Sequence, residues 1–315
     1  MLIRKKILIV VFAMITGFAG LMAQTAPDAT SHILEVEWAN DVWTGTDRYF
    51  TNGLELGYYN PFFRKLPSSY ILLPDKKGET VYQGLTLTQH FFTPDLHFAE
   101  SFTNDRPFAS YLLLGHRKIS LNKEKRIRKQ SELQIGILGR YSGGESIQNG
   151  IHKVLPTSEP VVGWDNQLHA NPALNYKMVF EHGLYNTKGF ELMSLANINL
   201  GIPYTDVGGG LKMRLGHMND YFSGFGVNNK KGWQLYFFAE AGAKYVAYNA
   251  TLEGGLLYDN AYVMKDIDRF VIQSRLGLAF TMKSFGIEVG QQTISREFKT
   301  GRSHMWGYVT FRFAF

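Results

Sequence analysis

Val309-Thr310-Phe311-Arg312-Phe313-Ala314-Phe315 closes the sequence and alternates large apolar side chains with polar or small ones. Successive side chains of a β-strand point to opposite faces, so the valine and the three phenylalanines share one face, while Tyr308, Thr310 and Arg312 share the other. A last strand with an apolar face and an aromatic end is typical of the closing strand of a transmembrane β-barrel. The stretch therefore predicts an all-β protein that lies in a lipid bilayer, which makes membrane lipids candidate substrates.

The same alternation recurs along the chain and predicts one domain, a transmembrane antiparallel β-barrel of about twelve strands. Leu133 and Ile135 alternate with Glu132 and Gln134, and other carboxylates fall on inner faces in the same way, which predicts a polar lumen. We expect the strands near residues 32–40, 50–58, 82–92, 108–120, 130–140, 172–182, 190–201, 205–216, 233–248, 270–282, 285–297 and 304–315.

An even number of strands places both termini at the same end of the barrel, on the periplasmic side. The first strand then runs outward and ends near Asn40-Asp41 at the outer surface. Connections at the inner end should be short, and three stretches fit this expectation: 122–124, 186–188 and 283–284. The stretches at 59–81 and 217–232 are longer than an inner turn should be.

The amino-terminal segment 1–23 has the three parts of a secretory signal peptide. The basic residues Arg4 to Lys6 precede a mostly apolar stretch, and the small Ala23 can precede a cleavage site. We expect cleavage before Gln24, which leaves residues 24–315 as the outer-membrane β-barrel. A retained membrane anchor is the alternative, but the apolar stretch is short and polar sequence follows it.

The composition limits the classes of protein that the chain can represent. The chain has no cysteine, so an exported protein of this length must be held by packing and hydrogen bonding alone. Its formal net charge is +6, and removal of the three basic residues of segment 1–23, which carries no acid, lowers it to +3. No basic stripe is interleaved with aromatic residues, so nothing indicates nucleic acid binding. We expect a monomer whose partners are outer-membrane lipids.

The long connection at 141–171 contains a predicted short helix in an outer loop. Apolar residues recur at helical spacing between Glu145 and Leu155, and Pro156 follows. Gln148 and His152 are four residues apart, so on a helix they share a face. We expect this amphipathic helix at the outer mouth of the barrel.

His152 is the best single candidate for chemistry. A histidine on an outer helix, with Gln148 one turn away to orient it or a reaction partner, can act as a general base near neutral pH. The alternative is an ordinary surface histidine, because the chain has nine histidines.

Asn40 and Asp41 form a second candidate site between the first two strands. Asparagine and aspartate oxygens at a strand end suit a hard cation such as Ca²⁺. The alternative is a polar hairpin loop, in which Asn, Asp, Gly and Thr are common for conformational reasons.

Further short motifs occur at Thr93-Pro94, at 105–109 (Asp-Arg-Pro-Phe-Ala) and at 163–168 (Gly-Trp-Asp-Asn-Gln-Leu). Each can be purely structural, and Trp164 is expected to be an interfacial aromatic residue. No Gly-x-Ser-x-Gly, His-Glu-x-x-His or Walker motif is present.

Five motifs in order resemble those of the LpxR family of outer-membrane lipid A deacylases. They are Asn-Asp-x-x-x-x-Thr-Asp-Arg-x-x-Thr-Asn-Gly at 40–53, Thr-Pro at 93–94, Asp-Arg-Pro-Phe-Ala at 105–109, Gln-x-x-x-His at 148–152 and Gly-Trp-Asp-Asn-Gln-Leu at 163–168. The resemblance spans most of residues 36–175. Ser110-Tyr111 departs from the family pattern, in which Gly-Trp is usual after the alanine.

The resemblance implies a twelve-stranded barrel that removes the 3′-linked acyloxyacyl group from lipid A by ester hydrolysis and needs Ca²⁺. The active site of the family lies between the barrel wall and a helix of an outer loop. By position, His152 resembles the general base with Gln148 beside it. Asn40 and Asp41 resemble the pair that shapes the cation and oxyanion site, and Glu159 resembles a family acid that follows the histidine.

Two rival functions remain open. An outer-membrane phospholipase is also a barrel of this size that hydrolyses acyl esters, although its usual Ser-His-Asn arrangement is not evident in the sequence. A non-enzymatic, porin-like channel would use the polar lumen and would need no helix over the rim. Assays with phospholipid and lipid A, and conductance in a planar bilayer, separate the three functions.

Overall fold

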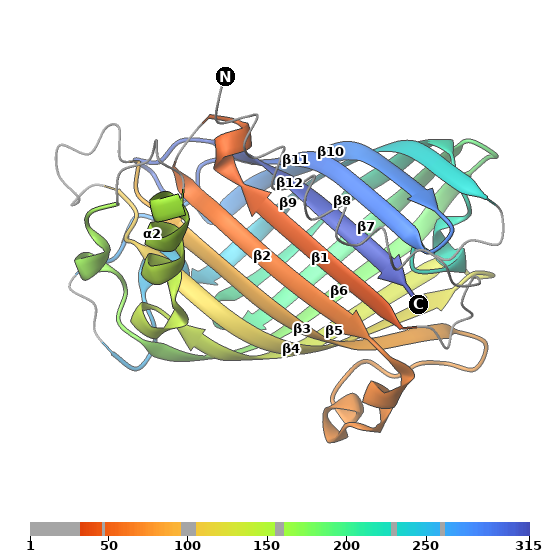
Figure 1. Cartoon of the computed structure of the whole chain (residues 1–315), viewed down its shortest axis with the longest axis horizontal. Coiled ribbons are helices and arrows are strands. Elements are labelled where there is room, and N and C mark those ends of the chain that lie inside the picture. The colour runs from red at the N-terminus through yellow and green to blue at the C-terminus, as the bar shows by residue number, and fades with distance from the viewer. Residues whose placement is uncertain (1–31, 46–47, 96–104, 155–160, 228–231, 259–261) are drawn as a thin grey trace.

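A computed structural model describes residues 32–45, 48–95, 105–154, 161–227, 232–258 and 262–315, of which 151–154 are described by backbone only. Twelve antiparallel strands close into one barrel (Figure 1). The strands are β1 Ile33–Asn40, β2 Tyr49–Tyr59, β3 Thr80–Thr93, β4 Ala109–Asn122, β5 Ile127–Leu138, β6 Asn171–Asn186, β7 Phe190–Gly201, β8 Tyr204–His217, β9 Trp233–Asn249, β10 Phe270–Met282, β11 Phe285–Ile294 and β12 His304–Ala314. The twelve expected strands are confirmed, with boundaries that differ by up to four residues. The segment 1–23 and its cleavage site lie outside the described residues.

The closing strand is the one that the sequence indicates. β12 pairs with β11 on one side and with β1 on the other, from Ile33 opposite Ala314 to Asn40 opposite Gly307. The backbone N–H of His32 also donates to the carbonyl oxygen of Phe315 at 3.0 Å. A closed sheet pairs its backbone groups from strand to strand, which a bilayer without water requires.

The outer face of the wall is apolar at mid-height. Leu114, Ile135 and Leu174 lie in one row across β4, β5 and β6, and their exposed fractions are 50%, 54% and 61%. Such a row of exposed leucine and isoleucine suits contact with acyl chains. Within the described residues, no helix combines the length and the apolar character needed to cross a bilayer.

The lumen is polar, as expected, and its charges are paired across strands. The Arg117 guanidinium lies 2.7 Å from both Glu132 and Glu55, and Arg312 lies 2.6 Å from Glu35. Charges removed from water are costly unless they are paired, and here each pair joins two strands. These ion pairs therefore connect the strands of the wall on the lumen side.

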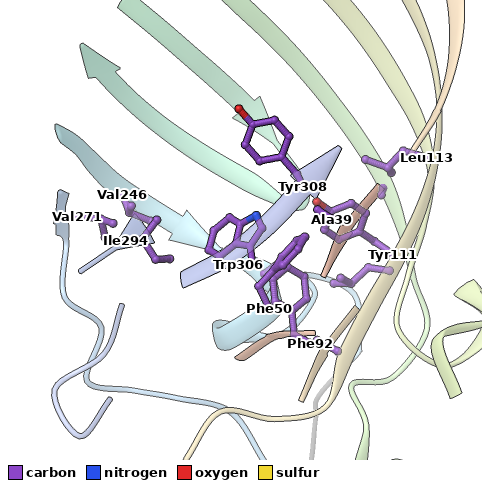
Figure 2. Packing of buried hydrophobic residues seen from close by; sticks show 14 of the residues in the cluster. Ala39, Phe50, Phe92, Tyr111, Leu113, Val246, Val271, Ile294, Trp306 and Tyr308 are labelled. Carbon is purple, nitrogen blue, oxygen red and sulfur yellow. The ribbon is translucent and has the colours of Figure 1, made fainter. Parts of the chain in front are cut away.

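Toward the outer mouth the lumen is filled by apolar and aromatic side chains from many strands (Figure 2). Phe50 of β2 stacks on Trp306 of β12 with ring centroids 4.5 Å apart, and Phe50 also meets Phe92 of β3 edge to face. Tyr111 of β4 extends this layer. These rings narrow the outer part of the lumen and line a cavity of about 290 Å³ there.

The long connection between β8 and β9 folds into the inner mouth of the barrel. Its 3₁₀ turn η8 (Tyr221–Ser223) brings the Tyr221 hydroxyl to within 2.8 Å of the Glu181 carboxylate, to which it donates. The Phe225 ring packs on Tyr59 of β2 and Tyr82 of β3. We call residues 218–227 the plug. This connection exceeds the length expected of an inner turn because it packs inside the barrel.

The second long inner connection, residues 60–79, lies against the outside of the wall, and we call it the collar. It contains two 3₁₀ turns, η3 (Pro61–Lys65) and η4 (Pro67–Tyr70), and projects from the barrel beside the inner ends of β3 and β5 (Figure 1). The Ser68 hydroxyl lies 2.7 Å from His116 Nδ1, and the backbone N–H of Leu73 donates to Ser131 Oγ. Its length also exceeds that of an inner turn, since the collar forms hydrogen bonds with polar side chains of the outer face.

An ion pair between Asp75 of the collar and the buried Lys118 of β4 fixes the collar to the wall. The hydrogen bond from the Lys118 ammonium lowers the pKa of the Asp75 carboxyl below its ordinary value of 3.8. A group whose pKa is lowered in the folded state stabilises that state above its ordinary pKa, and the contribution is lost as the pH falls through the folded value. We therefore expect the collar to be held firmly at neutral pH and to loosen only below about pH 4.

Asp75→Asn should reproduce this loosening at neutral pH, because it removes the negative charge and leaves Lys118 without its partner. Amide hydrogen exchange in the collar, corrected for the intrinsic effect of pH, should become several-fold faster. Asp266→Asn is the matched control, since the Asp266–Lys299 pair is exposed. Unchanged collar protection in Asp75→Asn would show that the ion pair does not fix the collar.

Candidate functional site

A row of mostly polar side chains crosses the outer face of the wall at the outer ends of β1 to β4. Asn40 pairs with Asn52, Asn52 with Phe91, and Phe91 with Ser110. The preceding or following residues, such as Ala39 and Tyr111, belong to the packed lumen, so the row itself points away from the lumen. Polar side chains thus occupy positions that face lipid elsewhere on the barrel.

Asn40 ends β1 and caps the 3₁₀ turn η2 (Asp41–Trp43). Its Oδ1 accepts a hydrogen bond from the backbone N–H of Val42 at 2.8 Å, which fixes the side chain. Its Nδ2 lies 3.3 Å from Asn52 Oδ1, to which the Trp38 indole N–H also donates at 2.8 Å. Asn40 and Asn52 therefore present one hydrogen-bonded pair of amides on the outer wall.

Asp41 follows at once and is fully buried. Its Oδ2 accepts a hydrogen bond from the backbone N–H of Arg48 at 2.8 Å, and its carbonyl oxygen accepts from the Thr44 hydroxyl at 2.8 Å. A buried carboxylate is costly, so its place at the end of β1 is held by hydrogen bonds from the turn that leads to β2.

The outer-loop helix covers this part of the wall from outside. The helix α2 spans Gly144–Val154, close to the expected 145–155, and lies on the outer side of the barrel wall (Figure 1). Just before it, the carbonyl oxygen of Ser142 accepts from Gln89 Nε2 at 2.7 Å, and the hydroxyls of Ser142 and Ser110 are hydrogen bonded. A Cβ on Gly144 would lie 2.6 Å from the Ser110 side chain, so glycine permits the close approach of helix and wall.

Gln148 connects α2 to the row on the wall through Trp164. The Trp164 indole N–H donates to Gln148 Oε1 at 2.7 Å, and both side chains are buried. The Trp164 ring packs against Phe108 and Phe91, with centroids 5.0 and 6.3 Å away. The expectation that Trp164 is an interfacial aromatic residue was wrong, because it fills the space between helix and wall.

The site residues expected from the sequence fall into two groups. The structure brings Asn40, Asp41 and Gln148 to the outer end of the β1–β4 wall, on both sides of Phe91 and Trp164. His152 lies in the last turn of α2, and its side chain is outside the described residues, as is the whole of Glu159.

The oxygen donors at the end of β1 have the chemistry that a hard cation prefers. The Asp41 carboxylate and the Asn40 amide oxygen are ligand types that Ca²⁺ takes, and the Asn40 oxygen, which accepts one hydrogen bond, keeps a second lone pair. The Asn52 amide oxygen already accepts two hydrogen bonds. Within the part of the chain that the structure describes, no three His, Cys, Asp or Glu side chains gather into a metal site. A cation at Asp41 would therefore draw on amide, backbone or water oxygens.

The motif at 105–109 shapes the rim beside this site. The Asp105 carboxylate accepts from the backbone N–H groups of Asp95 and Arg106, both at 2.7 Å, and burial raises the pKa of Asp105. The Arg106 guanidinium points elsewhere, with Phe92 under it at 4.3 Å and Glu297 at 3.6 Å. The two side chains thus hold the loop through separate contacts.

Sequence reasoning missed the structural roles of Asn52, Gln89, Ser110 and Trp164. The first three could have been recognised in the sequence. Each is a polar residue at a position that, by the alternation of side chains along its strand, faces outward. Polar residues on a face that otherwise meets lipid indicate that protein covers them. Trp164 left no such signal, since a tryptophan near the end of a barrel strand is ordinary at a membrane interface.

The Trp164–Gln148 hydrogen bond should control the order of α2. Trp164→Phe keeps most of the ring packing and leaves Gln148 Oε1 without its donor, which costs about 1–3 kcal/mol when the acceptor stays buried. Amide hydrogen exchange at residues 145–150 should become faster. Trp233→Phe is the control, because Trp233 is half exposed at the far end of β9. Equal protection of α2 in both variants would contradict the role of this bond.

Comparison with known proteins places this geometry in a family. A family model described as outer membrane protein LpxR matches residues 7–315. The structure of LpxR from Salmonella typhimurium is similar, with a TM-score of 0.73 and 21% identity, and the match covers 90% of this chain and 100% of that chain. The β-domain of the Bordetella autotransporter BrkA matches with a TM-score of 0.48 and 9% identity, over 91% of this chain and 100% of that one. A search of curated proteins found no match.

The LpxR match at 21% identity shows a shared fold, while the family model extends over almost the entire sequence. The match agrees with the twelve-stranded closed barrel and its outer-loop helix. The chain belongs to the LpxR family of outer membrane proteins.

Proposed function

We propose that this protein is a Ca²⁺-dependent hydrolase that removes the 3′-linked acyloxyacyl chain from lipid A in the outer leaflet. The observation that carries the proposal is the polar row of Asn40, Asn52 and Ser110 on the lipid side of the wall, with α2 packed beside it. Membership of the LpxR family supports the same reading.

The position of the site suits an ester that stays in the membrane. Asn40 lies at the outer end of β1, above the exposed Leu114, Ile135 and Leu174 of the wall. The ester bonds of lipid A lie near its sugars, at the depth of the outer rim. The sugar end of the substrate approaches the outer rim beside α2, because Trp164 fills the space between helix and wall, while its acyl chains remain in lipid against the barrel.

His152 acts as the general base in this mechanism. Positions 148 and 152 are one turn apart on the same face of α2, and Gln148 is buried. The imidazole takes a proton from water, and the water attacks the ester carbonyl without a covalent enzyme intermediate. The fixed Gln148 amide helps to orient the histidine or the water.

Asn40, Asp41 and Glu159 hold the cation. When bound, Ca²⁺ supplies positive charge that polarises the carbonyl and stabilises the developing oxyanion. The hydrogen bonds of Asn40 and Asp41 to the η2 turn keep their oxygens in place before the substrate arrives. Hydrocarbon cannot solvate an oxyanion, so this contribution matters most at the membrane boundary.

The two rival functions predict different results. A phospholipase would release fatty acid from phospholipid vesicles at a rate similar to that from lipid A. A channel would conduct ions in a planar bilayer, and the plug together with the Phe50–Trp306 layer argues against it.

His152→Ala should lower the rate of deacylation about 10²–10⁴-fold, the usual contribution of a general base. Mass spectrometry of lipid A from cells that express the variant should show no loss of the acyloxyacyl mass. His182→Ala is the control, since His182 is exposed on β6. A fully active His152→Ala barrel would refute the assignment of the base.

Asp41→Asn should raise the Ca²⁺ concentration needed for half-maximal activity by at least about tenfold, because even changes beyond the direct ligands of a metal cost that much. The asparagine can still accept the hydrogen bond from Arg48, so the turn should persist. Asp220→Asn at the inner end serves as the control. Activity of the unchanged protein that survives complete chelation of Ca²⁺ would exclude the metal from the reaction.

A further inference from the structure

The collar (residues 60–79) sits on the lipid side of the wall and not below the barrel. His116, Leu133 and Tyr176 form one outward-facing row across β4, β5 and β6. The collar contacts both ends of this row, since Ser68 Oγ lies 2.7 Å from His116 and the Tyr176 hydroxyl donates to the carbonyl oxygen of Ile71 at 2.8 Å. It therefore rests against the outer face of three neighbouring strands.

The next row toward the outer end is the exposed row of Leu114, Ile135 and Leu174. Two residues along a strand are about 7 Å, so the collar begins within one side-chain row of the apolar band. Ile71 in particular lies at the inner edge of that band. The collar thus extends from the apolar band toward the inner end of the barrel, on the side of the inner leaflet.

The collar turns large apolar side chains away from the protein. The exposed fractions of Phe62, Tyr70 and Ile71 are 59%, 94% and 57%, whereas Leu72 is buried against the wall. If the collar faced only water, the exposure of these apolar side chains would not stabilise it. One aromatic ring, one phenol and one branched chain at a membrane boundary are a typical interfacial set.

Charges in the collar are sorted between the two faces. Both acids point to the barrel, since Asp75 is paired with Lys118 and Glu79 lies 3.0 Å from Lys129. The basic residues are on the exposed side, and the Lys65 ammonium lies 6.0 Å from the Phe62 ring centroid. The Arg64 guanidinium lies 3.5 Å from Asp75, so the exposed basic residues left for lipid are Lys65, Lys76 and Lys77. The free face of the collar is therefore apolar and cationic.

We propose that the collar is a lipid-binding surface for the periplasmic leaflet of the outer membrane. Phe62, Tyr70 and Ile71 enter the boundary between headgroups and acyl chains. The ammonium groups of Lys65, Lys76 and Lys77 contact the phosphates of anionic glycerophospholipids. The collar thereby attaches one side of the barrel to the leaflet opposite the one that holds lipid A.

The absence of cysteine allows a direct test. Single variants Phe62→Cys and Tyr70→Cys carry a nitroxide label in the full-length barrel, reconstituted into vesicles of phosphatidylethanolamine and phosphatidylglycerol. Collisions of the label with oxygen, which concentrates in lipid, are compared with collisions with a water-soluble nickel chelate. Leu114→Cys reports lipid contact, and Lys125→Cys in the exposed β4–β5 turn reports water.

Labels at 62 and 70 should resemble the label at 114 and should lie deeper when phosphatidylglycerol is present. Replacing Lys65, Lys76 and Lys77 together by Gln should remove the dependence on phosphatidylglycerol, with the barrel still folded. Labels at 62 and 70 that behave like the label at 125 would overturn the proposal and leave a water-exposed face for a periplasmic protein. Lipid contact without any effect of phosphatidylglycerol would overturn the role of the cations.

Discussion

The pairing of β12 with β1 is the constraint on which the rest of the structure depends. Inside a bilayer an unpaired backbone N–H or carbonyl finds no water, so a sheet must have no free edge. The register from Ile33–Ala314 to Asn40–Gly307 meets this requirement. Since a closed sheet needs no disulfide to keep its ends together, an exported chain without cysteine can still be stable.

Closure also gives every strand an inner face toward the lumen and an outer face toward lipid. Polar residues on the outer face are the exceptions, and they share one feature. Charged side chains point inward, where they are paired, as Arg117 is with Glu132. Polar side chains point outward mainly at two places, near Asn40 and Ser110 at the outer end and near His116 and Lys118 at the inner end. At each place a segment from a connection covers them, α2 in one case and the collar in the other. Both proposed sites therefore lie where the outer face departs from the apolar pattern.

Much of the fold could be predicted because polar and apolar side chains alternate with a period of two residues along the sequence. Glu132 and Leu133 point to opposite faces because successive side chains of a strand alternate. The strands and the polar lumen could therefore be predicted from the sequence alone. The helix near Gln148 was also predictable, since apolar spacing and Pro156 mark it.

The fate of the two long inner connections could not be predicted, because it depends on contacts far away in sequence. No sequence pattern around Phe225 predicts that its ring packs on Tyr59. Likewise, no pattern around Asp75 predicts its ion pair with Lys118. Of the candidate site, Asn40 and Asp41 could be placed from the end of a strand. Their relation to Gln148 could not, because it passes through Trp164 and Phe91, and the resemblance to a family supplied it instead.

The orientation of the row at Asn40 and Asn52 has a consequence for kinetics. In the proposed reaction the lipid substrate reaches this row from the side, after diffusing in the plane of the leaflet, and never has to leave the membrane. Saturation then depends on the mole fraction of the lipid among its neighbours and not on its concentration in bulk water. A soluble compound that competes for the row must first partition into the leaflet, so its apparent potency includes its own membrane affinity.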